Sequence, residues 1–253
     1  MAWTWTLQGL YESGENGFVF SDSALLHGFM FLLYAVSACS LNALVKSNID
    51  WKPPAFVDSI KKGHNIALSL LSLFMAVVMI QETYLDGRYV SWESMACQKT
   101  PNKGFYGLVN FVYLASKIWE WGDTYFLSLY GKPIILLHFF HHMTTFTMAA
   151  LTHNFPVGGF AWINCLVHFV MYAHYAYPTR WARQAITSFQ LIQFVAVLSV
   201  NTYSYISGCF DYSEVGMEWL YCEGVVVGYF LLFVKFYVDN YIKTPKTKRV
   251  KKE

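Results

Sequence analysis

The chain has 253 residues, of which 55% are hydrophobic, 19% are aromatic and only 13% are charged. This composition excludes an ordinary soluble domain and indicates an integral membrane protein. The net charge of +2 gives no reason to expect a nucleic acid partner. The five cysteines show no CxxC spacing, so neither a zinc knuckle nor a thioredoxin-like site is expected.

Seven apolar segments follow one another along the chain. A membrane-spanning helix needs about 20 mostly apolar residues, and turn or charge signals such as Lys52-Pro53-Pro54 separate the segments. The predicted spans are residues 24–45, 64–82, 105–129, 134–151, 157–175, 187–206 and 217–241. We therefore predict an all-α integral membrane protein with a short N-terminal segment (1–23), a seven-helix transmembrane domain (24–241) and a basic tail (242–253).

The distribution of charged residues predicts how the chain is oriented. The N-terminal segment carries Glu12, Glu15 and Asp22 but no Lys or Arg, so no cleavable signal peptide is expected. Seven spans place the two ends on opposite sides of the membrane. Basic residues are far more numerous on the side that holds the C-terminal tail, which is therefore predicted to be cytosolic.

The predicted orientation places Cys97 and Cys209 on the same, non-cytosolic side. If that compartment is oxidising, the two thiols form a disulfide. The alternative is a pair of free cysteines.

Three charged residues lie on one face of the third predicted helix. Lys117, Glu120 and Asp123 are spaced three residues apart, so they lie on the same side. Because charged groups that face lipid are costly, these side chains must pair with each other or line a polar cavity. Two interpretations remain open: an ion-pair cluster that fixes helix packing, and acids that orient neighbouring histidines.

The fourth predicted helix carries an HxxHH box of His138, His141 and His142. Positions i, i+3 and i+4 share one helical face, so the three imidazoles lie on the same side. Imidazoles act as bases, nucleophiles or metal ligands near neutral pH, and ionisable groups inside a membrane helix usually mark function. The box predicts a catalytic site, and the alternative is three buried structural histidines.

Polar residues also form stripes on the fifth and sixth predicted helices. The fifth helix carries a continuous stripe of Asn164, His168, Met171, Tyr172 and Tyr175. The sixth opens with Thr187, Gln190 and Gln193, whose polar side chains either join helices or contact a substrate. In the predicted orientation, four polar stripes meet in the cytosolic half of the membrane.

A polar site above an apolar interior suits an amphiphile, with its head group at the cytosolic mouth and its hydrocarbon tail between helices. Several basic residues are candidates for contacts with an anionic head group. These are Lys61, Lys62, Lys132, Arg180, Arg183 and Lys235.

Four motifs in this order resemble the ELO family of fatty acid elongases, the very-long-chain 3-ketoacyl-CoA synthases. Residues 117–124 fit KxxExxDT, 138–142 fit HxxHH, 164–175 fit NxxxHxxMYxxY and 187–194 fit TxxQxxQF. His64-Asn65 also resembles a recurring family feature. The resemblance covers about residues 24–241, with one departure at His174, where many members carry Tyr. This departure leaves the substrate preference open.

The resemblance implies an enzyme that condenses acyl-CoA with malonyl-CoA and releases carbon dioxide, CoA and a 3-ketoacyl-CoA. It implies a fold in which helices two to seven form a barrel-like ring around a closed acyl tunnel. Besides membrane lipid, the implied partners are a ketoacyl-CoA reductase, a dehydratase and an enoyl reductase, and a homodimer is compatible with it. Neither a metal nor a cofactor is expected, because acyl-CoA and malonyl-CoA are substrates.

The resemblance also implies residence in the endoplasmic reticulum membrane, with a luminal N-terminus and a cytosolic C-terminus. The tail from Arg249 to Glu253 resembles a dilysine-type retrieval signal in which one Lys is replaced by Arg. Its alternative roles are to determine topology or to contact anionic lipid.

The proposed reaction suggests a role for each of the candidate site residues. His141 is the predicted nucleophile, which would form an acyl-imidazole, because no cysteine lies beside a histidine that could activate it. His138, His142 and His168 are predicted to position groups, transfer protons and stabilise an enolate, and Glu120 and Asp123 to hold the imidazoles. The predicted substrate contacts are Lys117, Asn164, Tyr172, Tyr175, Gln190, Gln193, Lys132 and Lys235.

Two other classes of membrane protein use some of the same residue types. A di-iron enzyme uses several histidine boxes as metal ligands, whereas this chain has eight histidines and one such box. A retinal-binding protein would use Lys235 with an Asp one turn earlier, where this chain has Leu231. Neither class accounts for the four motifs together.

Overall fold

The structure, a computed structural model, describes residues 24–48, 50–99, 104–152, 155–179, 182–213 and 215–243. Within these ranges every regular element is helical. The main helices are α2 (Ala24–Ser47), α3 (Phe56–Leu85), α5 (Gly104–Trp119), α6 (Trp121–Leu129), α7 (Leu136–Thr152), α8 (Ala161–Ala176), α9 (Ala182–Ser207) and α10 (Gly216–Tyr237). Shorter elements are η1 (Arg88–Val90), α4 (Trp92–Cys97), η2 (Pro156–Phe160) and η3 (Val238–Ile242). The N-terminal segment 1–23 and the proposed retrieval signal lie outside the described residues.

Helices occur at all seven predicted spans, but their ends differ. Helix α3 begins at Phe56 rather than at residue 64, so its first turns carry Lys61 and Lys62. The third predicted span is divided at Glu120 into α5 and α6. There the backbone N–H of Asp123 bonds to the carbonyl of Glu120 at 3.1 Å, a tighter turn than that of an α-helix.

Four helical segments are long and apolar enough to cross a membrane: Ala24–Ser47, Phe56–Leu85, Ala182–Ser207 and Gly216–Ile242. The chain is therefore a helical membrane protein. Helices α5, α7 and α8 have 16, 17 and 16 residues, fewer than the about 20 residues that span a bilayer. That these helices also cross the membrane stays a prediction.

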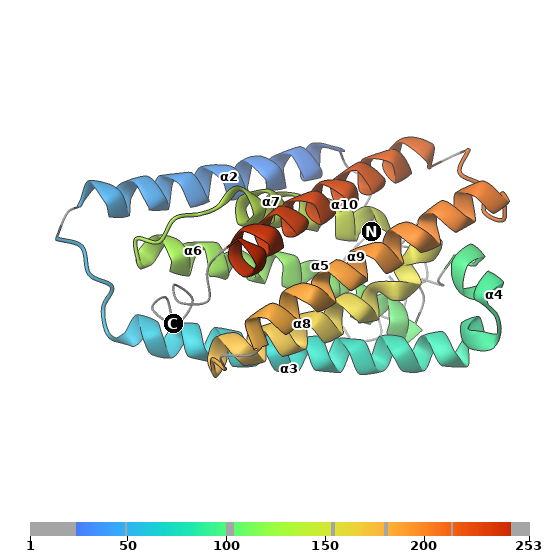
Figure 1. Ribbon diagram of the computed structural model, residues 1–253, viewed down its shortest axis with the longest axis horizontal. Coiled ribbons are helices and arrows are strands. Elements are labelled where there is room, and N and C mark those ends of the chain that lie inside the picture. The colour runs from blue at the N-terminus through green and yellow to red at the C-terminus, as the bar shows by residue number, and fades with distance from the viewer. Residues whose placement is uncertain are drawn as a thin grey trace, which may run out of the picture.

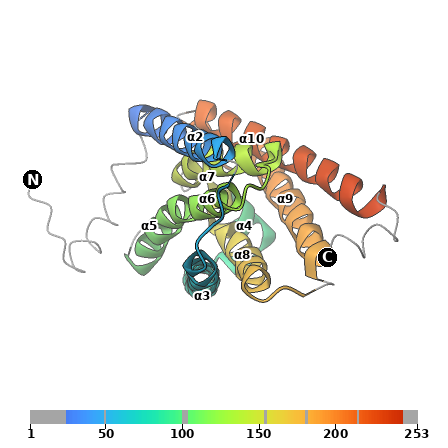
Figure 2. The same ribbon diagram turned by 90° about the vertical axis from the view of Figure 1, so that its left-hand side faces the viewer.

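The helices contact one another in a closed order. Helix α3 packs against α8, α8 against α9, α9 against α10, α10 against α7, α7 against α5, and α5 against α3. Figure 2 views this arrangement close to end-on, and α2 lies outside it, against α6 and α7. The long helices run roughly along the same axis (Figure 1). Residues from distant parts of the sequence can therefore lie at the same level along that axis.

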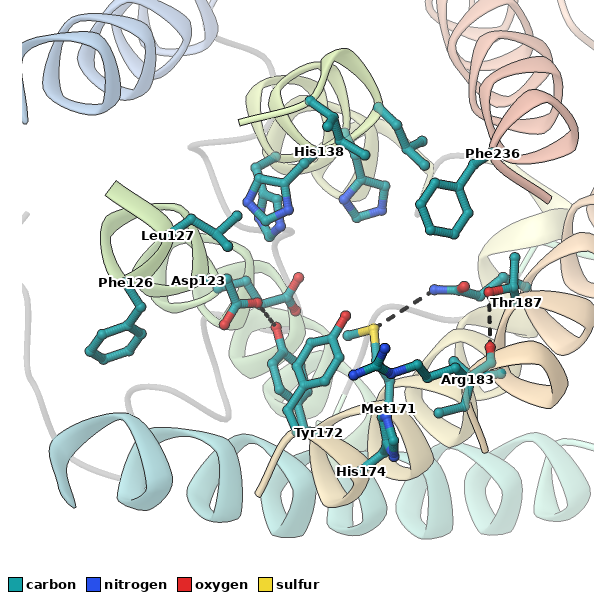
Figure 3. Close-up of a pocket in the computed structure, with 18 of the residues that line it drawn as sticks. Asp123, Phe126, Leu127, His138, Met171, Tyr172, His174, Arg183, Thr187 and Phe236 are labelled. Atoms are coloured by element: carbon teal, nitrogen blue, oxygen red, sulfur yellow. Dashed lines mark hydrogen bonds between the residues drawn. The ribbon is translucent and has the colours of Figure 1, made fainter. Parts of the chain in front are cut away.

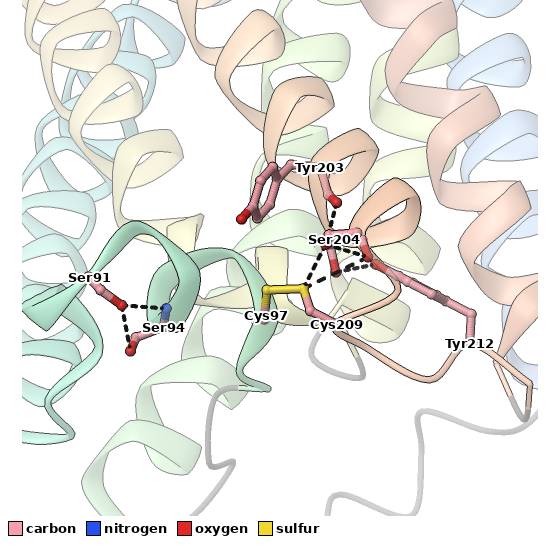
Figure 4. Close-up of a disulfide and its surroundings, with 8 residues drawn as sticks. Ser91, Ser94, Cys97, Tyr203, Ser204, Cys209 and Tyr212 are labelled. Atoms are coloured by element: carbon pink, nitrogen blue, oxygen red, sulfur yellow. Dashed lines mark hydrogen bonds between the residues drawn. A yellow bond between two sulfur atoms is a disulfide. The ribbon is translucent and has the colours of Figure 1, made fainter.

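The two ends of the arrangement differ in chemistry. At one end, Cys97 and Cys209 form a disulfide that joins α4 to the segment after α9, with a Cα–Cα distance of 5.4 Å (Figure 4). This is the pair that the predicted orientation assigns to the non-cytosolic side, and the orientation itself stays a prediction. The opposite end holds the first turns of α3 and α9, which carry Lys61 and Arg183 (Figure 1).

Candidate functional site

A cavity of about 660 Å³ lies among α3, α6, α7, α8, α9 and α10. All four sequence motifs contribute to its lining, part of which Figure 3 shows as sticks. The predicted site residues that line it are Glu120, Asp123, Lys132, His138, His141, His142, His168, Tyr172, Tyr175 and Gln190. Lys117, Asn164, Gln193 and Lys235 do not.

Glu120 joins α5 to α8 through a buried charge cluster. The Lys117 ammonium donates to Glu120 Oε1 at 2.8 Å, and Nδ1 of His168 lies 3.4 Å from the same oxygen. Lys117 also donates to Asn164 Oδ1 at 3.3 Å. All three ionisable side chains are buried. Lys117 and Asn164 therefore belong to the layer behind the cavity wall, where they set the position and charge of the Glu120 carboxylate.

Asp123 lies in a second cluster that links α6 to α3 and α8. Its Oδ1 is 3.2 Å from Nε2 of His64, and its Oδ2 accepts a hydrogen bond from the Tyr172 hydroxyl at 2.7 Å (Figure 3). His64 was not among the predicted site residues. The signal that could have identified it is the His64-Asn65 pair, whose second member lines the cavity.

The imidazoles of the HxxHH box have partners other than the two acids. Nε2 of His138 lies 2.8 Å from Thr124 Oγ1, and the His138 and His142 ring centroids are 4.4 Å apart. The His141 ring packs against Tyr229 at 4.9 Å. Within the described residues, no carboxylate is hydrogen-bonded to these imidazoles. The acids contact His64 and His168 instead, because they lie where α5 and α6 face α3 and α8.

Gly122 lets His64 approach Asp123. A Cβ atom at this position would lie 2.6 Å from Cε1 of His64, which is closer than real contacts allow. We expect Gly122→Ala to displace the imidazole and lower activity by about 10- to 100-fold, because small misplacements of a site are costly. Gly63→Ala is the matched control, since a Cβ there meets nothing within 4 Å. Full turnover by the Gly122→Ala protein would show that the contact with His64 is not needed.

Basic residues surround the mouth of the cavity. Lys61, Lys132 and Arg183 all line it, and the Lys61 ammonium lies 5.0 Å from the ring centre of Tyr130. The Tyr130 hydroxyl donates to the Asp58 carboxylate, which raises the pKa of Tyr130. The three other candidate head-group contacts differ in position. Lys62 does not line the cavity, and its ammonium lies 4.5 Å from the ring centre of Tyr177. Lys235 is 73% exposed outside the cavity and pairs with Asp239 at 2.5 Å, and Arg180 lies outside the described residues.

The two glutamines and His174 have distinct surroundings. Nε2 of Gln190 lies 3.7 Å from the Met171 sulfur at the cavity wall (Figure 3). Gln193 is buried, and its side-chain oxygen has no hydrogen-bond partner in the part of the chain that the structure describes. His174, the departure from the motif, accepts the backbone N–H of Thr179 through Nδ1 at 3.1 Å. It therefore shapes the turn after α8 at the mouth.

Across the described ranges, no group of three or more His, Cys, Asp or Glu side chains is arranged to hold a metal ion.

The apolar helices contact one another in a closed order. Histidines, acids and a basic mouth surround the cavity between them. These features define a helical membrane protein with a cavity lined by ionisable side chains. The model of the GNS1/SUR4 (ELO) family matches residues 19–249, and the chain belongs to this family.

Three relatives illustrate the similarity. The chain is 35% identical over 153 residues to human "Very long chain fatty acid elongase 3", which covers 55% of each chain. It is 31% identical over 216 residues to "Long chain fatty acid elongase 2" of Caenorhabditis elegans, which covers 75% of each. It is 27% identical over 222 residues to "Fatty acid elongase sre1" of Dictyostelium discoideum, which covers 83% of this chain and 81% of the relative.

Proposed function

We propose that this protein is a fatty acid elongase, a very-long-chain 3-oxoacyl-CoA synthase that condenses a long-chain acyl-CoA with malonyl-CoA. The observation that carries the proposal is the cavity in which the HxxHH box, His168, Glu120 and Asp123 meet below a basic mouth. The relatives named as fatty acid elongases support a role in fatty acid elongation. No cofactor enters this scheme.

The cavity suits the two parts of an acyl-CoA. Phosphate groups of CoA would bind at Lys61, Lys132 and Arg183, because ammonium and guanidinium groups form strong hydrogen bonds to phosphate oxygens. The acyl chain would lie among the apolar side chains of α7, α9 and α10. Phe194, Tyr229 and Phe233 form the buried core beside His141 and would border that chain.

His141 is the proposed nucleophile. An imidazole nitrogen attacks the thioester carbon of the acyl-CoA, the C–S bond breaks, and CoA leaves as a thiolate that takes the imidazole proton. Malonyl-CoA then loses carbon dioxide, and the electrons of the broken C–C bond form an enolate. The enolate carbon attacks the acyl carbon, the C–N bond to His141 breaks, and a proton from water restores the neutral imidazole.

The neighbouring residues would assist these steps. His168, whose Nδ1 lies 3.4 Å from Glu120, is placed to transfer protons. The Tyr172 hydroxyl, which is bonded to Asp123, borders the same space. Gln190 could donate to a carbonyl oxygen of either substrate.

We also propose that the closed order of helices is a barrel that spans the endoplasmic reticulum membrane. Its basic end would face the cytosol and its disulfide end the lumen, which is an oxidising compartment. The 3-ketoacyl product would pass to a ketoacyl-CoA reductase, then to a dehydratase and an enoyl reductase.

A condensation assay tests the proposed reaction. The protein in lipid nanodiscs would be incubated with radiolabelled malonyl-CoA and a panel of acyl-CoAs that differ in length and unsaturation. We expect a 3-ketoacyl-CoA that appears only with an acyl primer. The absence of product with every primer, from protein with a cooperative thermal transition, would overturn the proposal.

The mouth residues make a separate prediction about binding. Arg183→Glu should raise the KM for acyl-CoA about tenfold with little change in kcat, because a charged hydrogen bond to phosphate is replaced by repulsion. Lys46→Glu is the control, since Lys46 is exposed in the last turn of α2, outside the cavity. Equal KM changes in both variants would indicate a general effect of surface charge rather than a contact at the mouth.

A further inference from the structure

A chain of hydrogen bonds reaches the HxxHH box from α2, the helix outside the closed order. The Tyr34 hydroxyl lies 2.9 Å from Thr124 Oγ1, and the same Thr124 oxygen lies 2.8 Å from Nε2 of His138. Tyr34 and Thr124 are each 0% exposed. These contacts join α2, α6 and α7 at the depth of the box.

The ring of Tyr34 is held firmly in place. It packs against Trp121 at 5.3 Å and Phe139 at 5.5 Å between ring centroids, and stacks on His142 at 6.4 Å. The indole N–H of Trp121 donates to the backbone carbonyl of His142 at 3.2 Å. Because α6 and α7 close around this ring, its hydroxyl has little freedom to turn toward another partner.

The number of hydroxyl hydrogens decides which group donates in each of these two hydrogen bonds. Each hydroxyl has a single hydrogen to donate, and in the described part of the molecule the Tyr34 hydroxyl is hydrogen-bonded to Thr124. If Tyr34 donates to Thr124, then Thr124 donates to Nε2 of His138 and every hydrogen is used. In the reverse direction the buried phenol hydrogen has no acceptor, which costs about 1–3 kcal/mol.

We propose that Tyr34 is a positioning residue that, through Thr124, holds His138 in the tautomer with its proton on Nδ1. The inference rests on the proposed function and assigns a role within it. With Nε2 occupied as an acceptor, His138 serves as a hydrogen-bond donor to a substrate oxygen and not as the base or nucleophile. The covalent role then falls to another histidine of the box.

Tyr34→Phe tests the proposal, because it removes the hydroxyl and keeps the packed ring. Nitrogen-15 chemical shifts of histidine-labelled protein in lipid report the tautomer, and His138→Gln identifies the His138 signals. We expect His138 with its proton on Nδ1 in the wild type and a population with its proton on Nε2 in Tyr34→Phe. We also expect kcat to fall about tenfold with an unchanged KM for acyl-CoA, because one orienting hydrogen bond is lost.

Tyr125→Phe is the matched control. The Tyr125 hydroxyl lies 2.8 Å from Ser37 Oγ, so it also joins α2 to α6, but it does not line the cavity. We expect it to lower the melting temperature as much as Tyr34→Phe while leaving kcat and the tautomer unchanged. A second pair adds a conservative rescue: Thr124→Ser keeps the relay hydroxyl and should retain kcat, whereas Thr124→Val should lose it.

The outcomes separate this inference from the proposed function. An unchanged His138 tautomer in Tyr34→Phe would overturn the inference even if the enzyme is active, and so would an equal loss of kcat in Tyr125→Phe. Wild-type protein that makes no 3-keto product would overturn the proposed function. The tautomer measurement would still decide whether Tyr34 sets the state of His138.

Discussion

Replacing His141 with Ala should abolish condensation, with a loss of at least about 10³-fold in kcat, because the covalent path loses its nucleophile. The imidazole lies beside Tyr229 in the cavity, where an acyl chain among α7, α9 and α10 would place its thioester. The same variant should also fail to form a covalent acyl-enzyme.

Mass spectrometry can separate these two effects. Wild-type protein incubated with acyl-CoA alone and quenched in acid should carry one added acyl group on the peptide that contains His141. His27→Gln is the control, because His27 lies on α2 and does not line the cavity. An acyl group that persists on the His141→Ala protein would move the nucleophile to another residue.

Glu120→Gln should have the second large effect, because it acts on stability and on chemistry together. It leaves the Lys117 ammonium buried beside a neutral amide, and breaking a buried ion pair from one side costs about 3–5 kcal/mol. It also removes the carboxylate 3.4 Å from His168. We expect a lower melting temperature by circular dichroism and loss of most of the condensation activity.

A double variant separates the two contributions. Lys117→Met with Glu120→Gln removes both charges, so the melting temperature should recover toward that of the wild type. Condensation activity should stay low if the Glu120 carboxylate is needed to hold His168 as well as to fix the helices. Recovery of activity along with stability would support the simpler interpretation, an ion-pair cluster that only fixes the helices.

Periodicity alone predicted much of the arrangement. A spacing of three or four residues states which side chains share a helical face, so the box histidines and the acids of the third predicted helix were found without coordinates. The polar stripes of the four motifs do meet at one cavity. Element ends were less well predicted. No composition change marks the division at Glu120, and the first turns of α3 carry Asp58, Lys61 and Lys62, so they were not counted in an apolar span.

Pairing between helices could not be predicted in the same way. The acids were expected to hold the imidazoles of His138, His142 and His168. Glu120 does contact His168, but Asp123 contacts His64, which was not a predicted site residue. Lys235 and Arg183 both appeared as basic residues near a predicted cytosolic end, but only Arg183 lines the mouth. Which neighbour a side chain contacts depends on how two helices are rotated and tilted relative to each other. The spacing of residues along one helix gives no information about that geometry.

The sequence by itself determined the class of protein, the family resemblance and the residues that carry ionisable groups into an apolar interior, because composition and spacing are local properties. Only the tertiary structure decided that α2 lies outside the closed order and still reaches His138 through Tyr34 and Thr124. Tyr34 lies in an apolar helix, and no motif around it in the sequence indicates a functional role. Its hydroxyl gains a partner only when α2 packs against α6 and α7, because a hydrogen bond between distant segments exists only once they are brought together.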